Sequence, residues 1–394
     1  NLLDMIPTSS LWAGPEWNGH LDGPPLMVTK TKGNSQFRLS FHMGDLAHGL
    51  VIGPPGSGKS VLLSSMAMQF LRYPGAQVYI FDKGRSSRAA TLATGGNFYD
   101  LGKFGGEGAL SFQPFAGIDE EQDKIWAFDW LLSILAKEIQ ISPKIKERLW
   151  DGLNALASQA PKSRTFGILV SLVQSEEIKQ ALQPFVSGGA LGALLDSNKD
   201  TLDYGRWQSF EMEDLMNTPS AVMPVLSYLF HKLEKRFTGA PSLLILDEAW
   251  LFLDEPQFAE KIREWLKVLR KKNVSVIFAT QQLSDVIESD ISSAIIESCP
   301  TRVFLPNPNA RDKTVAPFYE SFGLNKRQIE IISMAQPKRD YYFQCPKGAR
   351  VFELALGPVG LALSASGSME DHAVMDDIMA HDPDHFLASF LEAK

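Results

Sequence analysis

The sequence contains little cysteine. Its 394 residues include only Cys299 and Cys345, which lie far apart and match no metal or redox spacing. We therefore expect free thiols in a reducing compartment. Long apolar runs are also missing. None approaches the roughly 18–20 residues of a membrane-spanning helix, so the sequence predicts no such helix.

Positive charge is in deficit. Lys and Arg total 38 against 46 Asp and Glu, which gives a formal net charge of −8. Nucleic-acid binding by the whole surface is therefore disfavoured and would require a local basic patch. An initial Met is also absent. The chain opens with "NLLDMIPTSS", from which we expect a processed or truncated chain and a further domain upstream.

One short stretch, "VIGPPGSGKS" at residues 51–60, is unusually rich in glycine and proline. It fits G-x-x-x-x-G-K-[ST], the phosphate-binding P-loop, and lies between an apolar strand pattern and an apolar helix pattern. Glycines allow backbone N–H groups to surround a phosphate. Lys59 is expected to reach the β- and γ-phosphates, and Ser60 to ligate Mg²⁺. The predicted nucleotide site comprises Gly53, Pro54, Pro55, Gly56, Ser57, Gly58, Lys59, Ser60 and Val61.

Two acidic residues strengthen this prediction. "LLILDEAWLF" at 243–252 reads as a buried strand that ends in Asp247 and Glu248, about 190 residues after the P-loop. P-loop enzymes need an acid at this edge of the sheet to organise Mg²⁺, a role that Asp247 fits. Glu248 is placed to polarise the attacking water.

A third apolar strand, "VSVIFATQQ" at 274–282, ends in polar side chains. Polar groups at the carboxyl end of a strand in an open α/β sheet face the ligand crevice. Gln281 could therefore sense the γ-phosphate or orient water. The alternative is a strand that merely runs into a polar loop.

The remaining patterns predict an α/β core with a helical insertion. Further strands are expected in "QFRLSFHMG", "AQVYIFDKGRSS", "GGNFYDLG", "ALSFQPF", "WQSFEMEDL" and "PTRVFLPNP", and a β-hairpin over 349–366 around Gly357-Pro358. "TFGILVSLV" reads as a helix, with a strand as the alternative. "TPSAVMPVLSYLFHKLEKRF" also reads as a helix, and its internal Pro224 should kink it or delay its start. We expect four segments: core 1–118, helical subdomain 119–200, core 201–366 and helical tail 367–394. The tail histidines His372, His381 and His385 show no ligand-like pairing and read as solvated surface.

A predicted amphipathic helix at 256–272 carries a basic face. A solvated face is the simplest interpretation, but such a face could also line a pore or meet a neighbour's phosphates. Its cations are Lys261, Arg263, Lys267, Arg270, Lys271 and Lys272.

Together these residues resemble the TrbE-like ATPases of conjugation and type IV secretion, within the HerA–FtsK group of hexameric motors. The likeness rests on "HGLVIGPPGSGKSVLL", "YIFDKGRSS", "LLILDEAWLFL", "LRKKNVSVIFATQQLSDV", "CPTRVFLPNP", "FYESFGLNKRQIEII" and "RVFELALGP", and covers nearly the whole chain. It implies a RecA-like P-loop core with a mainly parallel sheet and an all-helical insertion.

The resemblance also implies function. It points to a cytoplasmic ATPase, peripheral at the bacterial inner membrane, that uses ATP and Mg²⁺ to power pilus assembly and substrate export. Partners would be further copies of the chain, up to a hexamer, and other secretion-system components. Lys59, Ser60, Asp247, Glu248 and Gln281 match the family's phosphate, metal, catalytic and sensor positions. Arg270 matches a trans-acting arginine finger, with Arg85, Arg302 and Arg311 as rivals.

Three other functions stay open. The first is a DNA-translocating motor of the same superfamily, which the net charge disfavours. The second is a nucleotide-binding scaffold with little turnover, against which the intact acids argue. The third is a small-molecule kinase, although no arginine-rich lid segment is evident.

Overall fold

A computed structural model describes residues 12–102, 110–253 and 256–394. The opening "NLLDMIPTSS" lies outside the described residues. The chain forms two compact units. The first comprises the described residues of 12–98, 205–210 and 237–394, and the second those of 99–204 and 211–236.

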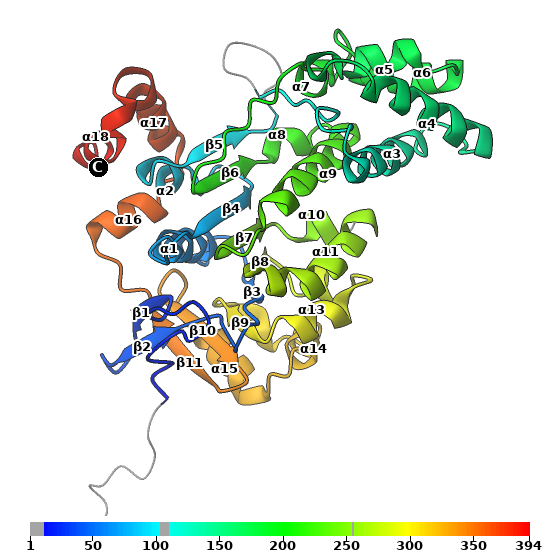
Figure 1. Cartoon of the computed structure of the whole chain (residues 1–394). Coiled ribbons are helices and arrows are strands. Elements are labelled where there is room, and N and C mark those ends of the chain that lie inside the picture. The colour runs from blue at the N-terminus through cyan, green and yellow to red at the C-terminus, as the bar shows by residue number, and fades with distance from the viewer. Residues whose placement is uncertain (1–11, 103–109, 254–255) are drawn as a thin grey trace, which may run out of the picture. The chain divides into compact units, whose positions relative to one another are not determined.

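An 11-stranded sheet, in the order β2-β1-β11-β10-β9-β3-β8-β7-β4-β6-β5, organises the fold (Figure 1). Its central strands are parallel, and β10, β11, β1 and β2 extend it as antiparallel strands. The strands are β1 (Met27–Lys30), β2 (Gln36–Leu39), β3 (Gly49–Ile52), β4 (Gln77–Asp82), β5 (Asn97–Asp100), β6 (Trp207–Glu211), β7 (Ser242–Asp247), β8 (Val274–Thr280), β9 (Thr301–Phe304), β10 (Asp340–Cys345) and β11 (Gly348–Glu353).

The central strands are apolar because both of their faces are covered. Every residue of β3, β7 and β8 is buried, as expected for parallel strands between layers of helices. In Figure 1, α1 and α16 lie on one side of these strands and α11 and α13 on the other. The core around Val51, Ile245 and Ile277 is fully buried.

Helices of the first unit cover this sheet. Helix α16 packs against α1 and α2, and α11 packs against α13. They are α1 (Lys59–Phe70), α2 (Arg88–Ala93), α10 (Trp250–Leu253), α11 (Pro256–Val268), α12 (Ser284–Ile287), α13 (Ser292–Ser298), α14 (Ala316–Ser321), α15 (Lys326–Met334), α16 (Pro358–Ser364), α17 (Met369–His381) and α18 (Phe386–Glu392), with the 3₁₀ turn η4 (Leu269–Lys272) after α11.

The second unit is mainly helical. Helix α4 begins with a serine cap: Ser142 accepts a hydrogen bond from the backbone N–H of Ile145, and Pro143 occupies the first helical position. The helices are α3 (Glu121–Leu135), α4 (Pro143–Ala157), α5 (Phe166–Leu172), α6 (Glu176–Leu182), α7 (Gly192–Leu195), α8 (Glu213–Met216) and α9 (Pro219–Arg236). Within the described residues, no helix combines the length and apolarity needed to cross a membrane.

The α/β fold with a mainly parallel sheet is confirmed. Of the two readings of "TFGILVSLV", the helix is confirmed. Helix α9 runs from Pro219 through Pro224, so its start is not delayed. The strand predicted in "ALSFQPF" is wrong. Ala109 lies outside the described residues and 110–115 forms no strand, because its backbone bonds to Leu194 in helix α7 and to Thr201 in the loop that follows.

The β-hairpin predicted over 349–366 is also wrong. Only its first part is a strand, β11, and the rest forms helix α16, which begins at Pro358. Proline is favoured at the first position of a helix because its missing N–H has no partner there in any case. Gly357-Pro358 therefore marks a helix start and not a turn.

Candidate nucleotide-binding site

The register of the sheet brings the predicted residues to one edge. Ile52 pairs with Thr280, and Asp247 pairs with Ala279, so β3, β7 and β8 end at the same level. The P-loop follows β3 and Gln281 follows β8. Parallel topology therefore gathers three chain segments that are far apart in sequence.

The P-loop is held by backbone bonds from its neighbours. Gly53 N–H donates to the carbonyl of Thr280 at 3.1 Å, and Lys338 N–H donates to the carbonyl of Ser57 at 2.9 Å. The hydroxyl of Tyr341 donates to the carbonyl of Gly58 at 3.1 Å. These bonds fix the loop so that its free amides can face an anion at the start of α1.

Gly58 requires glycine for two reasons. Its φ is +106°, and an added Cβ would lie 2.7 Å from the hydroxyl of Tyr341. We expect Gly58→Ala to lower the melting temperature by several degrees and to remove ADP binding. Gly56 is the matched control, since its φ is also positive, at +73°, but an added Cβ meets nothing within 4 Å. Thermal unfolding and calorimetric titration with ADP test this, and equal losses in the two variants would contradict the steric argument.

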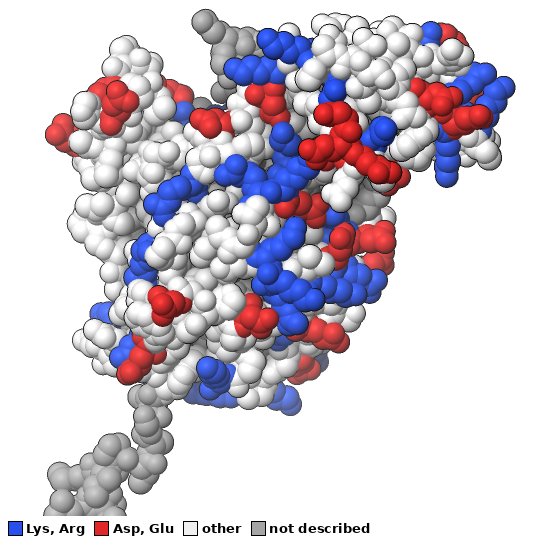
Figure 2. Space-filling model, in the orientation of Figure 1, with Lys and Arg blue, Asp and Glu red and all other residues white. Residues whose placement is uncertain are grey.

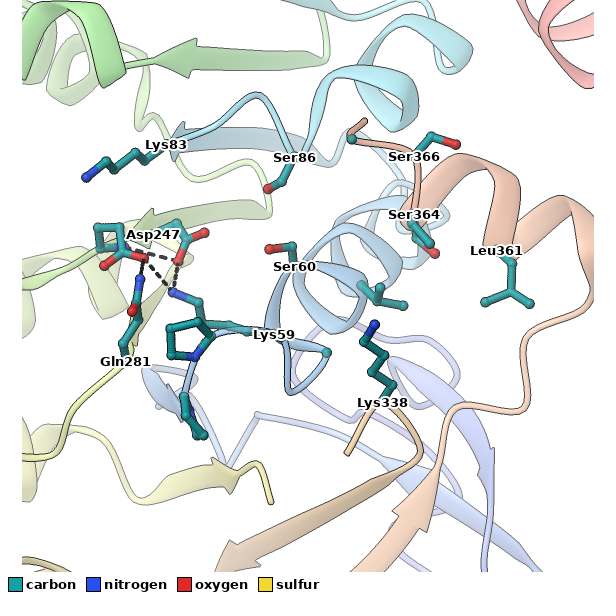
Figure 3. A pocket seen from close by; sticks show the side chains of 18 residues that line it. Lys59, Ser60, Lys83, Ser86, Asp247, Gln281, Lys338, Leu361, Ser364 and Ser366 are labelled. Atoms are coloured by element: carbon teal, nitrogen blue, oxygen red, sulfur yellow. Dashed lines mark hydrogen bonds and ion pairs between the residues drawn. The ribbon is translucent and has the colours of Figure 1, made fainter. Parts of the chain in front are cut away.

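Lys59 joins the P-loop to the two acids. Its Nζ lies 2.7 Å from Asp247 Oδ1 and 3.0 Å from Glu248 Oε1. Gln281 Nε2 donates to Glu248 Oε1 at 2.7 Å. Figure 3 shows these side chains converging on one end of the site. The structure brings these predicted site residues together, although Lys59 and Glu248 are 189 residues apart.

Burial makes this cluster electrostatically sensitive. Lys59, Asp247 and Glu248 are 8%, 4% and 7% exposed. Burial raises the pKa of the Asp247 carboxyl to about 6, although the nearby Lys59 charge opposes the rise. Burial alone would lower the pKa of Lys59, but the charges of Asp247 and Glu248 outweigh it and raise that pKa. One ammonium facing two carboxylates leaves an excess negative charge that suits a divalent cation.

The cluster lies in a cavity of about 480 Å³. Ser60 also lines this cavity, and among the described contacts its hydroxyl makes no hydrogen bond, so it is available as a ligand. Gly53 and Ser57 belong to the loop but do not line the cavity. The loop residues that line it are Pro54, Pro55, Gly56, Gly58, Lys59, Ser60 and Val61.

Several lining residues were not expected from sequence. Lys83 and Ser86 follow β4, and Lys338 precedes β10. The loop after α16 adds a further wall. The "FDKGRSS" motif drew attention to Lys83 and Ser86 without assigning them a role, whereas no sequence signal marks Lys338. The wall of α16 and its loop comprises Leu361, Ser364, Ala365, Ser366 and Gly367.

Arg270 is not brought to this cavity. It lies in η4, before the amino end of β8, whereas Gln281 follows the carboxyl end of the same strand. Its Nε lies 3.8 Å from Asp45 Oδ2, and its side chain is 44% exposed. The rivals Arg85, Arg302 and Arg311 do not line the cavity either. Arg302 instead donates to carbonyls of Cys299, Phe322 and Ile296.

Comparisons with known proteins also indicate a P-loop domain. Residues 156–344 match the family model of the TraG P-loop domain. The conjugal transfer protein TrbE of Rhizobium radiobacter is 46% identical over 381 residues, covering 94% of this chain and 46% of that protein. Over the part that it spans, the chain is therefore similar to TrbE proteins. That part is about half the length of the curated relatives.

Two solved structures share the fold of this chain. The structure of VirB4 of Thermoanaerobacter pseudethanolicus superposes with a TM-score of 0.67 at 18% identity, covering 88% of this chain and 100% of that one. The plasmid coupling protein TrwB in complex with ADP and Mg²⁺ superposes with a TM-score of 0.50 at 16% identity, covering 79% and 86%. The chain is therefore an α/β P-loop domain.

Proposed function

We propose that this chain is an ATP-hydrolysing motor domain of a conjugation or type IV secretion system. One observation carries the proposal: the P-loop lysine contacts two adjacent acids from a distant strand inside a cavity of about 480 Å³. A lysine for the phosphates, an acid for the metal and an acid for water are the parts that P-loop hydrolysis requires. The names of the TrbE and VirB4 relatives support the assignment to secretion.

In the proposed reaction, ATP binds with its β-phosphate in the P-loop and separates Lys59 from the acids. Lys59 then contacts the β- and γ-phosphates, and backbone amides of Gly56 to Val61 surround them. Glu248, freed from Lys59, accepts a proton from the attacking water. Gln281, already bonded to Glu248, orients that water against the γ-phosphate.

The residues present fit a magnesium ion. Asp247 and Ser60 supply a carboxylate and a hydroxyl, the hard oxygen ligands that Mg²⁺ prefers, and the cluster carries excess negative charge. Mg²⁺ would neutralise charge on the β- and γ-phosphates. The TrwB structure with ADP and Mg²⁺ supports the same cofactor assignment.

Assembly is the second part of the proposal. Figure 2 shows Lys and Arg side chains gathered over the place of α11 in Figure 1. In the α11–η4 segment these include Arg263, Lys267 and the exposed Arg270. Because Arg270 does not reach its own cavity, a catalytic role for it requires a neighbouring copy. We propose that the chain assembles, up to a hexamer, so that Arg270 acts in trans.

The setting belongs to the proposal as well. We propose that the protein works in the cytoplasm, peripherally at the bacterial inner membrane, with other secretion-system components as partners.

We also propose that residues 119–200 form the helical insertion between core parts 1–118 and 201–366, with 367–394 as a tail. Helices α3 to α7 all lie within 119–200, whereas the second compact unit is wider and also takes in residues before 119 and residues 211–236. DNA translocation is the alternative, and the basic α11–η4 face supports it.

Measuring the ATPase rate against protein concentration, with mass determined at each point, tests the proposed function. We expect turnover per subunit to rise as oligomers form. ATP that binds without hydrolysis at any concentration, with or without DNA, would favour the scaffold alternative. Stimulation that scales with DNA length would favour the translocase.

We expect Arg270→Ala to lower turnover of the assembled protein by about 10³-fold or more, with little change in ATP affinity. The matched control is Arg263→Ala, which removes an exposed cation from the same α11–η4 segment. Phosphate release at concentrations above and below assembly provides the measurement. An equal loss in the isolated subunit would contradict a role in trans.

A further inference from the structure

The cavity has two chemically different ends. One end holds Lys59, Asp247 and Gln281. Figure 3 shows Lys338 on the opposite side of the P-loop from this group, near Leu361 and Ser364. Since Lys59 and the acids mark the γ-phosphate end, the α-phosphate and the nucleoside of a nucleotide in the P-loop must extend toward the other end.

Lys338 is the cation of that second end. The lining residues there are otherwise uncharged. The hydroxyls of Ser364 and Ser366 already donate, to the carbonyls of Gly360 and Ala362 at 2.6 Å each. Within the described part of the chain Lys338 forms no ion pair, whereas Lys59 is matched by two acids. Lys338 therefore supplies positive charge that no neighbouring carboxylate neutralises.

The backbone holds Lys338 in place against the P-loop. Its φ is 63°, in the left-handed region that residues other than glycine rarely adopt. Its N–H donates to the carbonyl of Ser57 at 2.9 Å, and its Cα would lie 3.3 Å from a Cβ added at Gly58. The turn is further closed by mutual bonds between Gln336 and Asp340, each at 2.9 Å. The side chain is thus directed from a braced turn beside the loop.

We propose that Lys338 binds the α-phosphate of the nucleotide, as a second phosphate-binding lysine that acts independently of the metal. This inference rests on the proposed function, because it concerns the same nucleotide. A lysine suits this position, because its ammonium group is a compact charge on a flexible side chain and can adjust to the position of the phosphate. A hydrogen bond to a charged group of this kind corresponds to about tenfold or more in affinity.

Lys338→Gly gives the clearest test, because glycine accepts the positive φ and the fold is retained. Calorimetric titration without Mg²⁺ would measure ADP binding, and displacement of ADP would measure AMP and adenosine. We expect Lys338→Gly to weaken ADP and AMP by the same factor, about tenfold, and adenosine not at all. Lys338→Arg should keep most of the affinity. Lys347→Gln is the matched control, since Lys347 is an exposed lysine beyond the other end of β10 and does not line this cavity.

The outcomes separate this inference from the proposed function. If the unsubstituted chain binds no nucleotide, the proposed function fails. If it binds ADP and Lys338→Gly binds equally well, only the role of Lys338 fails. A loss for ADP without a loss for AMP would place the contact on the β-phosphate and overturn the assignment. A loss for adenosine would indicate a nucleoside contact and overturn it as well.

Discussion

Replacing Lys59 by Met is expected to remove nucleotide binding and to lower the free energy of unfolding by about 3–5 kcal/mol at neutral pH. Lys59 is buried between Asp247 and Glu248. Its removal leaves two carboxylates facing each other away from water, with no opposite charge. Breaking a buried ion pair in this way costs more than deleting both partners. ADP titration and urea unfolding provide the two measurements.

The loss should depend on pH. Burial raises the pKa of Asp247 to about 6, and Lys59 holds that pKa down, so the variant's pKa should be higher still. A carboxyl group with a higher pKa in the folded than in the unfolded chain destabilises the folded state. This destabilisation grows as the pH rises from the unfolded pKa to the folded pKa. We therefore expect the variant's deficit to shrink toward about pH 5 and to grow toward about pH 8.

The matched control for this prediction is Lys83→Met. Lys83 lines the same cavity but is exposed, so its removal should change the free energy of unfolding by no more than about 0.5 kcal/mol. Equal losses in the two variants, or a loss in Lys59→Met that is independent of pH, would show that the buried acids are not its cause.

Glu248→Gln is expected to lower ATP hydrolysis by about 10²–10⁴-fold while ATP affinity changes only slightly. The amide oxygen of the new side chain can still accept the hydrogen bond from Gln281, but it cannot take a proton from water. Phosphate release measures the rate, and equilibrium binding measures the affinity. Glu264→Gln is the control, because Glu264 is exposed and pairs only with Lys261 among the described ion pairs. Ordinary turnover in Glu248→Gln would exclude Glu248 as the base.

The backbone of Glu248 supports the role proposed for it. Its φ is 58°, a conformation that costs a residue other than glycine about 1–2 kcal/mol. Backbone strain of this kind clusters at sites where a side chain must be held in a particular direction. The carboxyl is held toward Lys59 and Gln281.

The sequence was most informative about the γ-phosphate end of the site. Apolar runs that end in polar residues predict buried parallel strands, and parallel strands end at one edge. This rule places Lys59, Asp247, Glu248 and Gln281 together without knowledge of the intervening residues. Strand and helix positions in the core follow from the same patterns, because burial on both faces leaves long apolar runs.

The opposite end of the site could not be predicted in this way. Lys338 lies in a turn, and a positive φ in a residue other than glycine has no sequence pattern. The hairpin predicted in place of α16 is wrong because Gly357-Pro358 is compatible both with a turn and with a helix start. Contacts with α1 and α2, which are distant in sequence, favour the helix.

The supports of the P-loop have a practical consequence for trimming the chain. Every recognisable motif of the site lies before residue 283, so a shortened protein ending after β9 would look complete by sequence inspection. It would nevertheless lack the partners of Ser57 and Gly58, which come from the turn before β10 and from Tyr341. Boundaries for a minimal domain therefore have to be set by these late-sequence supports and not by the motifs.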